Sequence, residues 1–241
     1  MQVFELYIRR LAKRKILLGS MIMLPVLFAV LLASLYEPYA NMEYVDMLNS
    51  MVGILMILTL MNSMLFYGDK QHMTAQRVLL SIHSKFSYYC QMVAVFLTIS
   101  AVQLVAMEIC SGVLLPGGFP LSLMENIIFF LAYGLFNIIA AGVGLLVMNQ
   151  SRSKHGGGLK LTAIVCLLVL LSGMFWAGGE PPAFFKHAAA VLPTYWLTKV
   201  ISILLDGVSR NMTQLLMYMT CLTLCASFIM LMLSRTKTEN I

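Results

Sequence analysis

The sequence contains few charged residues. Lysine, arginine, aspartate and glutamate make up 11% of the 241 residues, and hydrophobic residues make up 60%. A soluble domain typically carries roughly 25% charged residues, so this chain has too few polar side chains to cover a water-soluble globule. Apolar runs of about 20 residues, the length that crosses a bilayer as a helix, account with short connections for nearly the whole chain. We therefore predict an all-α, multi-pass protein of the cell membrane that forms one domain over residues 1–241.

Motifs that carry enzymatic chemistry are absent from the sequence. It contains no His-Glu-x-x-His motif and no Gly-x-Ser-x-Gly motif, which excludes the common zinc protease and serine hydrolase patterns. The five cysteines show no metal-ligand spacing. The run 156–160 (Gly-Gly-Gly-Leu-Lys) is not a phosphate loop, because the required spacing Gly-x-x-x-x-Gly-Lys-Ser/Thr is missing and no predicted strand precedes it. We predict that the chain is not an enzyme, holds no metal or cofactor, and needs a separate subunit for any ATP-driven work.

Six apolar runs are predicted to cross the membrane. Residues 16–35 contain Pro25, which is tolerated in a span where a neighbouring helix satisfies the freed backbone group. The stretch 183–205 is apolar but interrupted by Pro193, Trp196 and Lys199, so we predict a re-entrant element within the outer region 177–210 and not a further span. The six predicted spans are residues 16–35, 47–67, 91–115, 127–148, 161–176 and 215–233.

Positively charged residues predict which side of the membrane each loop faces. Cytoplasmic loops are enriched in Lys and Arg. With an internal N-terminus, thirteen of the sixteen Lys and Arg residues lie inside, and only Lys186, Lys199 and Arg210 lie outside. We therefore predict that both termini are cytoplasmic. The formal net charge of +6 is assigned to the membrane surface on the same grounds, and not to nucleic acid.

Two cytoplasmic segments combine apolar and polar residues. Residues 1–15 carry five basic side chains among aromatic and aliphatic ones, which predicts an amphipathic helix on the inner membrane surface or, equally, a positive flank of the first span. Residues 68–89 are polar but are interrupted by apolar positions, which predicts a loop with one or two short amphipathic helices.

Three polar residues within the predicted spans are candidates for a transport pathway. Ionisable and polar side chains at membrane depth often mark such pathways. For Glu108 the alternative is contact with interfacial water near the outer end of its span. For Gln103 and Asn137 the alternative is a hydrogen bond between helices, which is the commoner role of membrane amides.

Three stretches resemble the membrane subunits of type 2 ABC exporters, which move drugs, peptides or glycolipids. The basic segment 1–15 resembles the connecting helix of this family. Residues 68–74 (Gly-Asp-Lys-Gln-His-Met-Thr) and 77–82 (Arg-Val-Leu-Leu-Ser-Ile) resemble its acidic loop and coupling helix. Residues 171–176 and 192–196, with the intervening Glu180-Pro181-Pro182, are similar to its signature around the fifth span and the outer re-entrant helices. Ala177 stands where the family usually has proline.

The resemblance implies partners and roles for individual residues. The partners are two cytoplasmic ABC ATPase subunits, which would bind ATP and Mg²⁺, and a second permease of the same or a related sequence. Leu79 and Ile82 would anchor the coupling helix in an ATPase groove, although a loop resting on lipid headgroups fits the same pattern. An aromatic belt at the interface is likewise an alternative to an outer gate. The coupling candidates are Asp69, Lys70, Thr74, Arg77, Leu79 and Ile82, and the outer-gate candidates are Gly173, Phe175, Trp176, Pro182, Pro193, Tyr195 and Trp196.

Two other functions stay open from the residues alone. A substrate-binding membrane subunit of an uptake system could have the same number of spans and would retain its ligand without ATP. A lipid-modifying membrane enzyme would need an acid, a base or a metal site that the motifs do not supply. The resemblance favours an export permease for an apolar or amphipathic cargo.

Overall fold

A computed structural model describes residues 2–13, 15–36, 44–64, 85–114, 121–151, 153–176, 183–208 and 211–235. Its regular elements are all helical, which confirms the predicted all-α class. They are α1 (Gln2–Lys13), α2 (Lys15–Tyr36), α3 (Tyr44–Asn62), α6 (Lys85–Leu114), α7 (Leu123–Gln150), α8 (Lys154–Leu171), the 3-10 helix η2 (Ala183–Phe185), α9 (Lys186–Ala189), α10 (Pro193–Asp206) and α11 (Met212–Arg235).

Four of these helices, α3, α6, α7 and α11, are individually long and apolar enough to cross a membrane. The number rises to six if each of two bent pairs, α1 with α2 and η2–α9 with α10, forms one span. The predicted fifth span corresponds to α8, which has 18 residues and is shorter than each of these four helices. At about 1.5 Å per residue α8 is about 27 Å long, slightly less than the roughly 30 Å hydrocarbon core.

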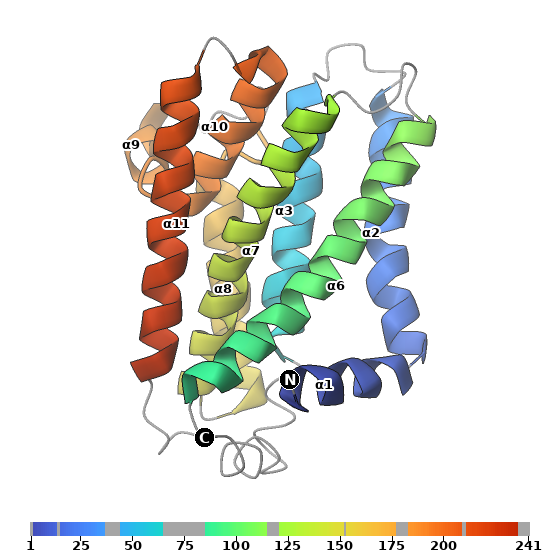
Figure 1. The fold of residues 1–241 in the computed structure, drawn as a ribbon, viewed down its shortest axis with the longest axis vertical. Coiled ribbons are helices and arrows are strands. Elements are labelled where there is room, and N and C mark those ends of the chain that lie inside the picture. The colour runs from blue at the N-terminus through green and yellow to red at the C-terminus, as the bar shows by residue number, and fades with distance from the viewer. Residues whose placement is uncertain are drawn as a thin grey trace.

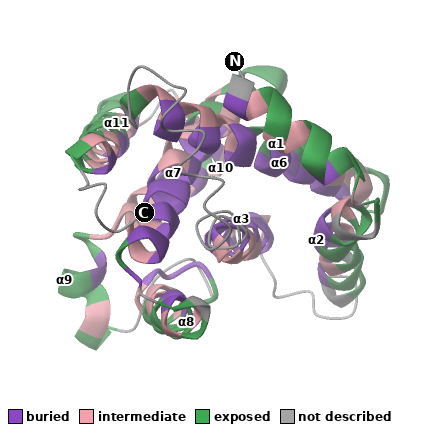
Figure 2. Cartoon of the chain, turned by 90° about the horizontal axis from the view of Figure 1, so that it is seen from below, coloured by how far each residue is buried: buried purple, intermediate pink, exposed green. Residues whose placement is uncertain are grey.

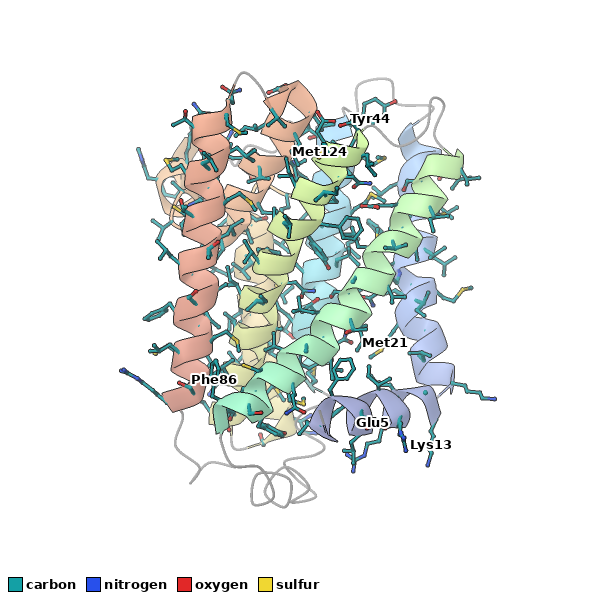
Figure 3. The ribbon with its side chains drawn as sticks, viewed as in Figure 1. Glu5, Lys13, Met21, Tyr44, Phe86 and Met124 are labelled. Atoms are coloured by element: carbon teal, nitrogen blue, oxygen red, sulfur yellow. The ribbon has the colours of Figure 1, made fainter. Side chains whose placement is uncertain are left out.

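The helices form one upright bundle with different structures at its two ends (Figure 1). The amphipathic α1 lies across one end, with 78° between segments 3–13 and 18–32. The last turn of α11 lies at the same end, which we call the α1 end. Figure 3 places Glu5, Lys13 and Phe86 at the α1 end and Tyr44 and Met124 at the opposite end.

The central helix of the bundle is α7, which packs against α3, α6, α8, α10 and α11. Its aromatic residues Phe129 and Phe136 and its aliphatic Leu145 are buried in the core. Figure 2, seen from the α1 end, shows buried residues along α7 and α10, whereas α2, α8 and α11 have exposed outer sides. Those outer sides carry large apolar residues such as Leu224 and Phe228, as expected for surfaces that face lipid.

Glycines bring α7 close to its neighbours. A Cβ atom added at Gly144 would lie 2.6 Å from the Ser63 hydroxyl oxygen, and one added at Gly142 would clash with a methyl carbon of Ile229. Gly134, in the same helix, has no such atom within 4 Å. Gly142 and Gly144 therefore allow α11 and α3 to approach α7, which is the role small residues play in membrane bundles.

Candidate functional site

The predicted outer gate begins with a tight turn after α8. The helix ends at Leu171, and Gly173 has a φ of 77°, a left-handed conformation that glycine adopts without steric cost. The Ser172 hydroxyl accepts a hydrogen bond of 3.1 Å from the Met174 amide, and Met174 is fully buried. The turn is thus fixed on both sides of Gly173, and it directs the next residue, Phe175, toward the bundle.

Phe175 packs on the only described glycine of α3, Gly53. A Cβ atom added at Gly53 would lie 2.6 Å from the tip of the Phe175 ring. The ring remains 38% exposed, so it has room to move away from α3. Gly53 was not among the residues singled out from the sequence, although an isolated glycine inside an apolar helix is a recognised sign of close packing.

We expect Gly53→Leu to displace the Phe175 ring and to reduce transport more than it reduces stability. Overpacking of this kind costs about 1–3 kcal/mol, and a second change, Phe175→Ala, removes the atoms that clash. Transport and thermal unfolding of the two single variants and the double variant should therefore show a coupling of about 0.5–3 kcal/mol.

The matched control is Gly19→Leu in α2, because no atom lies within 4 Å of a Cβ added there. It should leave both transport and stability close to those of the parent chain. If Phe175→Ala fails to restore any function to Gly53→Leu, the contact between α3 and the turn is not what the substitution disturbs.

The second part of the predicted gate is a sharp bend between two helices. Segment 183–189 (η2 and α9) meets α10 at 103°, a bend that is compatible with a broken span and with the predicted re-entrant element. Pro193 occupies the first turn of α10, where its missing N–H costs nothing. Just before it, the Ala190 carbonyl accepts a 2.9 Å hydrogen bond from the Trp196 indole. The bend is therefore fastened by its own aromatic residue.

The gate candidates form two separately fastened groups. The Trp176 indole donates to the Leu170 carbonyl at 3.2 Å, and the Trp196 indole donates to its own segment, so neither tryptophan is bonded to the other. The Lys199 ammonium lies 5.4 Å from the centre of the Tyr195 ring, a cation–π distance. Pro182 lies outside the described residues.

Gln103 is fully buried and bonds α6 to α2. Pro25 has no N–H group, so the carbonyl of Met21, one turn earlier, has no partner within its own helix. The Gln103 side-chain amide donates a 2.8 Å hydrogen bond to that carbonyl oxygen. This bond supplies the Met21 carbonyl with the donor that Pro25 lacks. A hydrogen bond between helices is the second of the two roles considered for Gln103.

The other two pathway candidates lie apart from Gln103. Glu108 reaches Asn126 in the first turn of α7. Asn137 is 2% exposed, and neither of its amide atoms has a hydrogen-bond partner among the described residues. Asn49 of α3, which was not among the candidates from the sequence, is also buried, and neither of its amide atoms has a hydrogen-bond partner among the described residues. Among the described residues, the three pathway candidates are therefore not joined to one another by hydrogen bonds.

The predicted connecting helix is held to the bundle at its N-terminus. The first amide groups of a helix have no internal partner, and here the side-chain oxygen of Gln91 in α6 accepts hydrogen bonds from Val3 at 3.0 Å and Phe4 at 3.4 Å. Val3 and Leu11 are buried against the bundle, while Arg9 is exposed and paired with Glu5. Because the capping residue lies 87 positions away, this cap could not be predicted from the residues next to α1.

The predicted coupling residues are not covered by the structure. Asp69, Lys70, Thr74, Arg77, Leu79 and Ile82 all lie outside the described residues. The helix α6 begins at Lys85, so the last five residues of the predicted loop 68–89 belong to it. Tyr88 and Tyr89 are fully buried there, in contact edge to face at 5.4 Å.

Comparison with known proteins identifies the family. The family model described as ABC-2 type transporter matches residues 3–205, which covers the described helices from α1 to α10 apart from Gln2 and Asp206 and does not include α11. No curated protein matches the chain. Among the described residues, no group of three or more His, Cys, Asp or Glu side chains is placed to hold a metal ion. On the strength of the family match, this integral membrane protein belongs to the ABC-2 type transporter family and is a permease subunit of the kind that associates with ABC ATPases.

Proposed function

We propose that the chain is the permease subunit of an ATP-driven exporter for an apolar or amphipathic cargo such as a drug, an antimicrobial peptide or a lipid-linked molecule. It works with a second permease, identical or related, in the cell membrane. ATP and Mg²⁺ are bound by separate ATPase subunits and not by this chain. The α1 end faces the cytoplasm, and the opposite end carries the gate.

The observation that carries this proposal is the different construction of the two ends, in a chain of the ABC-2 family. At the α1 end, an amphipathic helix lies across the bundle with exposed Arg9, Arg10 and Lys13, and an excess of basic residues is typical of the cytoplasmic side. The gate segments instead carry the Gly173 turn and the 103° bend before α10. An α1 end that can contact a cytoplasmic partner, together with bent aromatic segments at the gate, is what a gated transport pathway needs.

A direct mechanical route connects the ends. The helix α6 has 30 residues, about 45 Å at about 1.5 Å per residue, and so spans the whole bundle. In sequence it follows the predicted coupling residues, and it holds α1 through Gln91 and α2 through Gln103. In the proposed cycle, closure of the ATPases pushes on segment 68–84, α6 transmits the displacement, and the gate segments open toward the outside.

Replacing Leu79 and Ile82 by aspartate is expected to abolish association with the ATPase. Each lost apolar anchor costs at least about 1 kcal/mol in an interface of this kind, and a buried charge adds to that, so binding should weaken by about 100-fold or more. ATP-dependent efflux of an amphipathic fluorescent dye should be lost, while the permease still accumulates in the membrane.

Ser81→Asp, at a polar position of the same segment, is the matched control and should keep both association and efflux. The proposal is wrong if the double variant retains full ATPase association and transport.

A further inference from the structure

An apolar groove runs along the outside of α11 near the α1 end. Its volume is about 420 Å³, and its lining comes from three helices: Phe86 of α6, Leu135 and Ile138 of α7, and Thr223, Ala226, Ser227, Met230, Leu231 and Ser234 of α11. It is open on one side. In a chain that spans a membrane, this open side faces the hydrocarbon of the bilayer.

The shape of the groove follows from the packing of α7 and α11. Gly142 lets Ile229 approach α7 closely, so the two helices are tightly joined along one line. Beside that line α11 presents the small residues Ala226 and Ser227, which leave the groove its depth. Phe86, half exposed, forms its end wall.

The hydroxyl groups in the groove are already satisfied by α11 itself. Thr223 donates to the Met219 carbonyl at 2.8 Å, Ser227 donates to the Thr223 carbonyl at 2.8 Å, and Ser234 donates to the Leu231 carbonyl at 2.7 Å. No donor therefore remains to select a polar ligand. The surface is apolar in effect and suits a hydrocarbon chain.

The length and position of the groove match one leaflet. From Thr223 to Ser234 is eleven residues, about 16 Å of helix at about 1.5 Å per residue. That is about half of the roughly 30 Å hydrocarbon core. The groove therefore extends from the surface at the α1 end to about the middle of the membrane, the depth reached by one acyl chain.

The surface end of the groove carries a positive charge. Arg235, next to the lining residue Ser234, is exposed and ends α11, and no acidic partner for it is found in the part of the chain that the structure describes. Glu5, an acid at the same end, is paired with Arg9. An exposed guanidinium at the headgroup level favours a phosphate, which it binds with two parallel hydrogen bonds.

We propose that this groove binds one acyl chain of an anionic phospholipid from the leaflet at the α1 end, with its phosphate at Arg235. The site is independent of the cargo and of the direction of transport. It lies where α6 and α11 meet, so an occupied groove fastens the α1 end of α11 to the start of α6.

The test uses the full chain in lipid nanodiscs containing phosphatidylglycerol with a photoactivatable acyl chain, followed by mapping of the labelled peptides. Labelling is expected on lining residues of α11 such as Ala226, Met230 and Leu231, and on Leu135 or Ile138 of α7. Ser227→Trp fills the groove from an exposed position and should lower this labelling by at least fivefold. Leu224→Trp, also on α11 but outside the groove and 71% exposed, is the matched control and should not.

The charge is tested by competition. Unlabelled phosphatidylglycerol should displace the probe about fivefold better than phosphatidylcholine does, and Arg235→Gln should remove that preference, since one cation at the surface contributes about 1 kcal/mol. Equal labelling of Ser227→Trp and Leu224→Trp would show only the ordinary lipid annulus and overturn the proposal. So would displacement by an exported compound but not by phosphatidylglycerol, because the groove would then be a cargo site.

Discussion

Gly144→Leu is expected to destabilise the permease by at least about 1–3 kcal/mol, the usual cost of overpacking a well-filled core. The Cβ atom alone would lie 2.6 Å from the Ser63 hydroxyl oxygen and 2.8 Å from the Ser63 Cβ. The Ser63 Cβ is attached directly to the backbone at the end of α3, so it cannot move aside as the end of a long side chain can. The whole of α3 would have to shift from the central helix α7, and thermal unfolding in detergent should report the loss as a lower midpoint.

Gly134→Leu provides the control within the same helix. It adds the same atoms where no neighbour lies within 4 Å, and leucine favours helix over glycine by up to about 1 kcal/mol. Its midpoint should be unchanged or higher. Equal destabilisation by the two substitutions would mean that helix propensity or the membrane surface, and not the contact between α3 and α7, determines the result.

Gln103→Leu is expected to cost about 1–3 kcal/mol, the penalty for leaving a buried group without its hydrogen bond. The carbonyl of Met21 would lose its donor at membrane depth, where water cannot replace it. Because Pro25 is the reason that this carbonyl needs an outside donor, Pro25→Ala should remove most of the cost. Unfolding of the two single variants and the double variant gives the coupling directly.

Asn137→Leu is the contrasting case for Gln103. Both amide atoms of Asn137 are buried with no partner in the described part of the chain, so an apolar replacement should be neutral or stabilising. An identical loss for Gln103→Leu in the parent and in the Pro25→Ala background would contradict the account of the Gln103 bond. A loss of transport without a loss of stability in Asn137→Leu would assign that residue to the pathway.

Patterns within one segment predicted most of the fold. Apolar run length predicted the helices α2, α3, α6, α7, α8 and α11, and the amphipathic pattern gave α1 as one of two interpretations of residues 1–15. The interruptions around Pro193 predicted the bend before α10. The start of α6 was placed six residues late, because Lys85 and Ser87 made the segment look like a loop although Tyr88 and Tyr89 are buried in the core.

Contacts between distant segments could not be predicted. Gln91 caps α1 from 88 and 87 residues away, and Gly53 meets a ring more than 120 positions later. Neither pairing follows from periodicity or composition. The role of Gln103 was open for the same reason, since only the fold shows that Met21 lies opposite it.

Isolation of the chain from its native membrane tests most directly whether it works as an ATP-driven permease. A mild detergent extract, purified through a tag on this chain, should contain an ABC ATPase subunit and a second permease. Reconstituted in vesicles, the complex should move an amphipathic dye only when ATP and Mg²⁺ are supplied on the ATPase side. A chain that purifies alone and tightly retains a small solute without ATP, or that converts lipids to new products, would contradict the account.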